Sequence, residues 1–156
     1  MLPDQRVGID IEHAAIHSGL SFNICTYASL TELRIGILVP SGLTAHLRGS
    51  YQSEDSAIVQ LRGPNVALAA APALALQNRM IGGNASRVLW SLNPVITFLG
   101  NPIEDRQMLA LTGLFSSQIA ETQPGQEWVL TPGTYLIRIS NAHLSSKQIL
   151  ANLYEA

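Results

Sequence analysis

Two histidines near the amino terminus have the spacing of a metal-binding pair. His13 and His17 stand four residues apart, so on a helix they would share one face. Glu12 and Asp10 lie beside them, and a carboxylate is a frequent third ligand of zinc and related metals. However, no glutamate follows His13, as it does in the metal-binding helix of zinc proteases. We therefore interpret this segment as a polar stretch, and we expect no metal or other cofactor.

The candidate nucleophiles lack neighbours that would activate them. Cys25 is the single cysteine of the chain, and a free cysteine without such neighbours usually behaves as a small apolar side chain. A single cysteine also rules out an intrachain disulfide framework and a cysteine-rich metal or iron–sulfur site. Serines are frequent, but no G-x-S-x-G elbow presents one of them on a strained turn. We therefore expect no catalytic residue and no enzymatic activity.

Acidic pairs and a glycine pair are the remaining candidates for chemistry. Glu54-Asp55 and Glu104-Asp105 are adjacent carboxylates, but sequence neighbours point to opposite sides, whereas the carboxylates of a glycosidase flank a cleft. Neither pair lies among the alternating oxygen ligands of a calcium loop. Gly82-Gly83-Asn84 lacks the lysine of a phosphate-binding loop. We predict hydrophilic loop tips at both acidic pairs and a turn at the glycines.

The basic residues are almost all arginine. Of the nine, only Lys147 is a lysine. The planar guanidinium forms bidentate pairs and packs on apolar surfaces, so arginine suits protein interfaces better than lysine does. Interface contacts and a compositional bias of a GC-rich genome explain this pattern equally well. The arginines in or beside predicted strands or the central loop are Arg34, Arg48, Arg62, Arg79, Arg87 and Arg138.

The composition favours a protein that buries surface against other protein. The 156 residues suit one domain, and only 13% of them are charged, whereas 47% are hydrophobic. This balance excludes a disordered chain, and a net charge of −2 argues against a nucleic-acid partner. The uncharged runs 63–78 and 88–103 are too short and interrupted to cross a membrane. Residues 1–20 carry three acids, so we expect no secretory signal.

Short alternating segments dominate the chain after Leu33. In Thr44–Tyr51, for example, Ala45 and Leu47 alternate with His46 and Arg48, as in a strand with one buried face. Proline and glycine turns separate such segments. We predict strands at Leu33–Val39, Thr44–Tyr51, Ala57–Arg62, Arg87–Leu92, Val95–Leu99, Gln107–Leu111, Glu127–Leu130, Thr134–Asn141 and Gln148–Tyr154.

Two stretches do not follow this pattern. Val66–Arg79 is rich in alanine but contains Pro72, so we interpret it as a long excursion with one helical turn near Leu74–Asn78. Residues 1–31 lack strong alternation, and we interpret them as an extended arm. The resulting prediction is an all-β protein, in which residues 32–156 form an antiparallel β-sandwich that resembles a jelly roll.

The carboxyl-terminal third carries the most specific pattern. Glu127-Trp128-Val129-Leu130 precedes a short turn, then Tyr135-Leu136-Ile137-Arg138-Ile139, and finally Leu153-Tyr154-Glu155. This pattern, with His13, Ile16-His17-Ser18-Gly19 and Asn78-Arg79 upstream, resembles a family of small β-sandwich proteins encoded in the structural modules of tailed bacteriophages. Members of that family look like capsid decoration (cement) or head-associated proteins. The family's terminal tryptophan is replaced here by Leu153.

The resemblance implies a structural virion protein. Such a decoration protein would lie on the outer surface of the capsid, bind the major capsid protein and stabilise the shell by bridging neighbouring subunits. We expect a homo-oligomer, specifically a trimer, with arm 1–31 lying across the shell or a neighbouring subunit, and no contact with nucleic acid or membrane. The alternative is a tail or fibre sandwich that binds carbohydrate or a receptor.

A small set of side chains is expected to form the interface. The aromatic candidates, Trp90, Trp128, Tyr135 and Tyr154, could equally fill the core. With them we expect interface roles for Arg34, Arg48, Arg62 and Arg79.

Overall fold

The protein is an all-β molecule built from antiparallel pairs of strands. The computed structural model describes the chain except for residues 1–14, 16, 54, 109–117 and 122–127. The strands of the described part are β1 (Ser21–Val39), β2 (Ala45–Ser53), β3 (Ala57–Arg62), β4 (Ala67–Ala70), β5 (Ala73–Leu74), β6 (Gln77–Asn78), β7 (Leu89–Leu92), β8 (Val95–Phe98), β9 (Pro102–Met108), β10 (Gln118–Glu121), β11 (Trp128–Leu130) and β12 (Gly133–Glu155).

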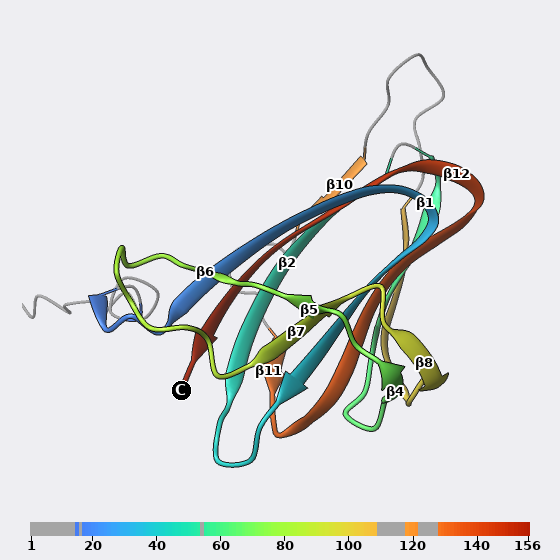
Figure 1. Ribbon diagram of the computed structural model, residues 1–156. Helices are drawn as coiled ribbons and strands as arrows, with labels where there is room; N and C mark the ends of the chain where they lie inside the picture. Colours follow the sequence, from blue (N-terminus) through green and yellow to red (C-terminus); the bar gives the residue numbers. More distant parts are fainter. Residues whose placement is uncertain (1–14, 16, 54, 109–117, 122–127) are drawn as a thin grey trace, which may run out of the picture.

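Two long strands, β1 and β12, organise the fold. They pair from Ser21↔Tyr154 to Val39↔Gly133. Figure 1 shows that this pair bends sharply and runs back on itself. Each long strand therefore contributes one half to each of two facing layers, which makes a sandwich out of one continuous hydrogen-bonded sheet.

The other strands extend the two layers from both sides of the long pair. In the first layer, β6 pairs with β1, and β2 pairs with β12. Both β10 and β11 pair with the far side of β2. In the second layer, β7 pairs with β1 and β5 with β7, while β3 pairs with β12 and β9 with β3. A separate two-stranded ribbon consists of β4 and β8.

Alternate residues of both layers form one core. After the bend the inward positions of β1 change from even to odd numbers, since the register of the long pair shifts between Leu30 and Glu32. Each wholly buried leucine or isoleucine contributes about 1.5–3 kcal/mol. The first layer supplies Phe22, Ile24, Ala45, Leu47, Ile149, Ala151 and Leu153, and the second supplies Leu33, Ile35, Ile37, Val59, Leu61, Trp90, Tyr135, Ile137 and Ile139.

A buried lysine closes the core at the bend. Lys147 is 0% exposed. Its Nζ donates to the backbone oxygen of Leu30, and to the Oγ and backbone oxygen of Ser145 at 2.9 and 3.3 Å. Buried backbone carbonyls need hydrogen-bond donors, and the register shift at the bend interrupts the ladder there. The ammonium group of Lys147 therefore binds the backbone of both bent strands.

The ribbon packs close to the outer face of the second layer. A Cβ built on Gly36 in β1 would lie 2.3 Å from the Oγ of Ser91 and 3.0 Å from the Cδ1 of Leu68. A side chain at this position would therefore push the ribbon and β7 outward. The backbone N–H of Arg34 donates to the Asn93 side chain, and the Asn93 N–H donates to the Arg34 carbonyl, so the turn before β8 is tied to β1.

The prediction of an antiparallel sandwich is confirmed, whereas the jelly-roll connectivity stays a prediction. The predicted strand Ala57–Arg62 matches β3, and Thr44–Tyr51 and Val95–Leu99 match β2 and β8 within a few residues. Arg87–Leu92 and Glu127–Leu130 correspond to the shorter strands β7 and β11. Thus the segments with clear alternation are strands.

Two predicted boundaries are wrong for one physical reason. The arm was predicted over residues 1–31, but 21–31 belong to the first half of β1. Thr134–Asn141 and Gln148–Tyr154 were predicted as separate strands, but they are the two halves of β12. The polar residues between them suggested a turn, whereas the structure accommodates them in a bend that the long partner strand follows.

Three smaller predictions need correction. The helical turn expected near Leu74–Asn78 is absent from the described structure, where short strands β5 and β6 pair with β7 and β1. Tertiary hydrogen bonding thus overrides the helical preference of alanine and leucine. The strand predicted at Gln107–Leu111 begins earlier, at Pro102, and its last three residues lie outside the described part. Strand β10 lies in a region where no strand was predicted.

Candidate interaction surface

Large apolar side chains are exposed on the outer faces of the sandwich. In the first layer, Leu150 of β12 and Val129 of β11 point outward. In the second layer, Ile58 of β3 does the same. Phe98 of β8 is 53% exposed on the ribbon. Single exposed apolar side chains occur on most proteins, whereas a contiguous apolar patch is typical of a surface that other protein covers.

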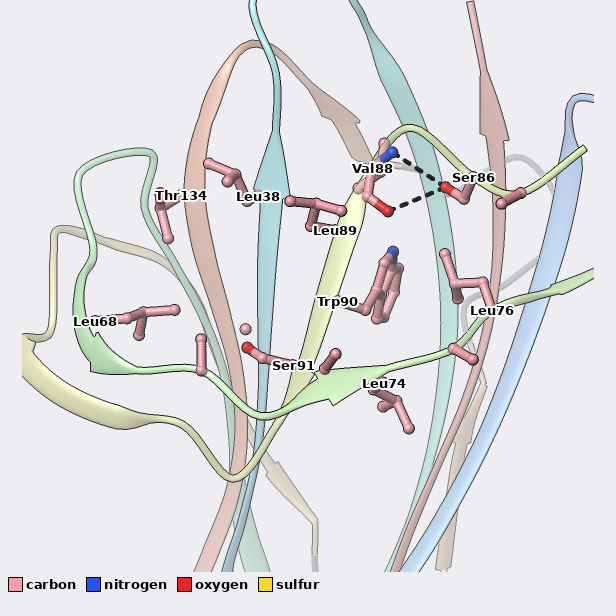
Figure 2. A pocket seen from close by; sticks show the side chains of 15 residues that line it. Leu38, Leu68, Leu74, Leu76, Ser86, Val88, Leu89, Trp90, Ser91 and Thr134 are labelled. Atoms are coloured by element: carbon pink, nitrogen blue, oxygen red, sulfur yellow. Dashed lines mark hydrogen bonds between the residues drawn. The ribbon is translucent and has the colours of Figure 1, made fainter.

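The surface beside β7 contains an apolar cavity. Leu38 and Leu89 are register partners on β1 and β7 and are both exposed. They form one wall of a cavity of about 640 Å³. Figure 2 shows the segment that carries Leu68 and Leu74 passing across this cavity, with the indole of Trp90 between β7 and Leu76. The cavity arises because β7 pairs with β5 over only two residues, Ser91 and Trp90.

An ion-pair cluster lies on the outer face of the second layer. The Glu32 carboxylate accepts a hydrogen bond from Nη2 of Arg34 at 2.9 Å and lies 2.7 Å from Nε of Arg138. Burial opposes ionisation of Glu32, but the hydrogen bond from Arg34 and the charge of Arg138 outweigh it and lower the pKa of the carboxyl group. Arg34, a predicted interface residue, is thus engaged within the sheet together with Arg138.

Arg62, Arg48 and Arg79 lie in three different parts of the molecule. The guanidinium of Arg62 donates to the backbone oxygens of Leu99 and Gly100, at 3.1 and 2.9 Å, and so fastens the loop after β8. Arg48 is half-buried on the outer face of β2. Arg79 is exposed after β6. The predicted arginines therefore do not form one patch, and several of them have structural partners.

The aromatic candidates are mainly core residues. Trp90 and Tyr135 are buried, and Trp128 packs against the core. The Tyr135 hydroxyl donates to the Thr131 carbonyl at 2.9 Å. Tyr154 is half-buried on the outer face of the first layer, where its ring stacks on His46 with a centroid distance of 4.2 Å. Of these four side chains, Trp128 and Tyr154 are thus the two that are partly exposed.

Among the described residues, those considered for chemistry do not come together in one site. His13 lies outside the described residues, and His17 is exposed near a turn. The Sγ of Cys25 is exposed and accepts a hydrogen bond from the Gln148 amide at 3.2 Å, which is not a basic partner. Within the described ranges, no group of three or more His, Cys, Asp or Glu side chains could hold a metal ion.

The acidic pairs differ from their prediction. Glu104 and Asp105 were expected at a loop tip, but they lie within strand β9, at the outer edge of the second layer. Pairing with β3 holds their backbone extended. Glu54 lies outside the described residues, and Asp55 lies in a bend. Gly82 has φ +78° in the predicted turn, a backbone conformation that glycine adopts without strain.

Sequence reasoning missed a buried carboxylate. Glu155 accepts hydrogen bonds from the Ser86 hydroxyl at 2.5 Å and from the N–H and Nε of Arg87 at 2.8 and 3.0 Å. The Glu155 side chain is 1% exposed, whereas that of Arg87 is 60% exposed. The sequence contained one signal for it: Glu155 lies two residues after Leu153, so it continues the alternation of inward-facing Ala151 and Leu153.

The fold and this surface define an all-β sandwich that exposes large apolar side chains on both layers and on the ribbon. Comparison of the chain with family models, with curated proteins and with solved structures found no match. Within the described residues, no helix has the length and apolar character needed to span a membrane.

Proposed function

We propose that this protein is a structural subunit that works by burying apolar surface against other protein. In its specific form, it is a decoration subunit on the outside of a tailed-phage capsid, where it braces neighbouring major capsid proteins. The observation that carries the proposal is the exposure of large apolar side chains on both layers and on the ribbon. In a monomer of low charge content, such groups favour association.

The internal construction supports a bracing role. The long strands β1 and β12 run through both layers, so a load applied to one layer passes through continuous backbone to the other. Polar contacts made by Lys147 and Glu155 fasten the bend and the end of β12. Stabilisation of a shell requires only that the subunit bind the assembled form more tightly than the free components. The sequence resemblance supplies the identity of the shell.

The alternative of a carbohydrate-binding module has less support. Sugar recognition by a sandwich would use exposed aromatic faces. The rings of Trp90 and Tyr135 are buried, and one face of Tyr154 is covered by His46. A glycan array with the full chain separates the two functions, because binding to a defined sugar would favour the module and contradict the cement proposal.

Co-sedimentation with purified empty heads of the virus whose genome encodes this chain tests the proposal. We expect the wild-type chain to pellet with the heads in saturable amounts and to raise the temperature at which they open. Leu150→Lys and Phe98→Lys each place a charge on one apolar face. We expect at least one of them to weaken binding tenfold or more, which corresponds to about 1.4 kcal/mol.

Controls carry the same charge at exposed positions outside these faces. Ser41→Lys lies in the turn between β1 and β2, and Thr97→Lys lies beside Phe98 on β8, where successive side chains point to opposite faces. Both should bind as the wild type does. A wild-type chain that stays in the supernatant at all concentrations would rule the capsid role out.

A further inference from the structure

The cavity beside β7 has the dimensions of a small-molecule site. Its volume of about 640 Å³ lies within the range of about 300–1,000 Å³ that is usual for such sites. Its walls come from four parts of the chain, namely the outer face of β1, the segment that includes β4 and β5, the segment from Ala85 to Ser91, and Thr134 of β12. Neither the Glu32 cluster nor Lys147 lines the cavity, whereas Ser86 and Val88 of the lining bond to the Glu155 carboxylate.

The lining is apolar and uncharged. Leucines predominate, alanines fill the gaps between them, and none of the lining residues is acidic or basic. A charged ligand would lose its hydration here without gaining an ion pair. The leucines are Leu38, Leu68, Leu74, Leu76 and Leu89.

One polar group in the lining has no hydrogen-bond partner. Trp90 is only 4% exposed, so its Nε1 is shielded from water, and no described atom accepts its hydrogen. The hydroxyl of Ser86, toward which the nitrogen end of the ring lies in Figure 2, already bonds to Glu155 and Val88. Buried donors normally have an acceptor. A ligand that carries an acceptor into the cavity would supply this partner.

We propose that the cavity beside β7 binds an uncharged, mainly aliphatic molecule, with a hydroxyl or carbonyl oxygen that accepts the hydrogen bond of Trp90 Nε1. The leucine walls contact the aliphatic part, and the indole N–H orients the polar end. This binding activity goes beyond the proposed structural function, and neither depends on the other.

Titration of the full chain with 1-decanol, followed in ¹H–¹⁵N correlation spectra, tests the proposal. The two indole N–H signals come from Trp90 and Trp128. We expect the Trp90 signal to move in a saturable, one-to-one titration, while the Trp128 signal stays in place. Decanoate, which has the same chain length and a charged end, should bind at least tenfold more weakly.

Two variants locate the site. Trp90→Phe removes the N–H and should weaken decanol binding about fivefold to tenfold. Leu89→Glu changes a 60% exposed wall residue, so it leaves the core intact, and it should weaken binding tenfold or more. Ile58→Glu is the matched control on β3, outside the cavity, and it should bind decanol like the wild type.

Three results would overturn the proposal. They are a non-saturable response of the Trp90 signal, equal binding of decanol by Leu89→Glu and the wild type, and equal binding of decanoate and decanol. The last result would remove the preference for an uncharged ligand on which the assignment depends.

Discussion

Glu155 illustrates how single polar side chains hold the ends of this sandwich. Its carboxylate receives hydrogen bonds from Ser86 and Arg87, two residues that immediately precede β7. The segment thereby connects the carboxyl end of β12 to the start of β7, although the two are not hydrogen-bonded strand neighbours. A buried donor left without an acceptor lowers the free energy of unfolding by about 1–3 kcal/mol. The Glu155 contact therefore contributes more to stability than an exposed ion pair does.

We expect Glu155→Ala to lower the free energy of unfolding by about 2–3 kcal/mol, because it leaves the Arg87 N–H and the Ser86 hydroxyl without the carboxylate and removes one of the two acceptors of the Val88 N–H. Urea denaturation followed by tryptophan fluorescence measures this change. Asp105→Ala removes an exposed acid from edge strand β9 and should shift the value by about 0.5 kcal/mol or less. Equal effects of the two variants would contradict the role of Glu155.

The Glu32 cluster predicts a pH dependence of stability. The pKa of the folded-state carboxyl lies below its ordinary value of 4.5, so folding favours the ionised form. Its contribution is fully present above pH 4.5 and is lost as the pH falls through the lowered pKa. Since Arg34 is 37% exposed, solvent screening limits the contribution to about 1 kcal/mol.

Comparison of Glu32→Gln with the wild type isolates this contribution. The difference in free energy of unfolding between them should shrink as the pH falls from 6 to below the lowered pKa. A difference that stays constant over this range would show that the carboxylate charge is not responsible.

At the scale of the strand, the bend in β1 and β12 is the decisive element. The register shift leaves backbone groups of both strands without their regular ladder partners, and the ammonium of Lys147 binds two of the carbonyl oxygens there. Because of the bend, the paired strands β1 and β12 contribute to both layers. A sandwich with this construction needs a polar contact inside its core, since a purely apolar core cannot satisfy bent backbone.

We expect Lys147→Met to destabilise the fold by about 1–3 kcal/mol, since methionine keeps an apolar stem of similar length but donates no hydrogen bonds. Amide hydrogen exchange should rise most at the bend, around Leu30 and Ser145. Asn152→Met, on the exposed face of the same strand, is the control and should leave both quantities unchanged. Unaltered exchange at the bend in Lys147→Met would contradict this account.

At the scale of the whole molecule, the apolar exterior dominates the expected behaviour. Ile58, Leu150 and Phe98 are exposed on different faces, so association through more than one face is expected. Association through apolar contacts depends little on salt, whereas surface ion pairs weaken as the Debye length falls from about 10 Å at 0.1 M to about 3 Å at 1 M.

Sedimentation velocity at micromolar concentration should therefore detect oligomers of the purified chain at both salt concentrations. We expect Phe98→Lys or Leu150→Lys to shift the distribution toward the monomer, whereas Thr97→Lys should not. A stable monomer for the wild type at all concentrations would contradict the association and weaken the proposed structural role.

The sequence alone determined the local features of this protein. Alternation in segments such as Ala57–Arg62 predicts strands because successive side chains of a strand point to opposite faces. The same pattern and the low charge predicted an all-β sandwich with an apolar exterior. The candidate interface stays a prediction; Trp90 and Tyr135 belong to the core, and Arg34 and Arg62 bind within the molecule.

Only the tertiary structure decided which segments join. Residues 21–31 and 141–146 resemble an arm and a turn because local preference does not report a distant partner strand, yet pairing across the bend extends both β1 and β12 through them. The cavity beside β7 and the contacts of Lys147 and Glu155 have the same origin. They depend on groups far apart in the chain, whose proximity comes from long-range strand pairing rather than from any local pattern.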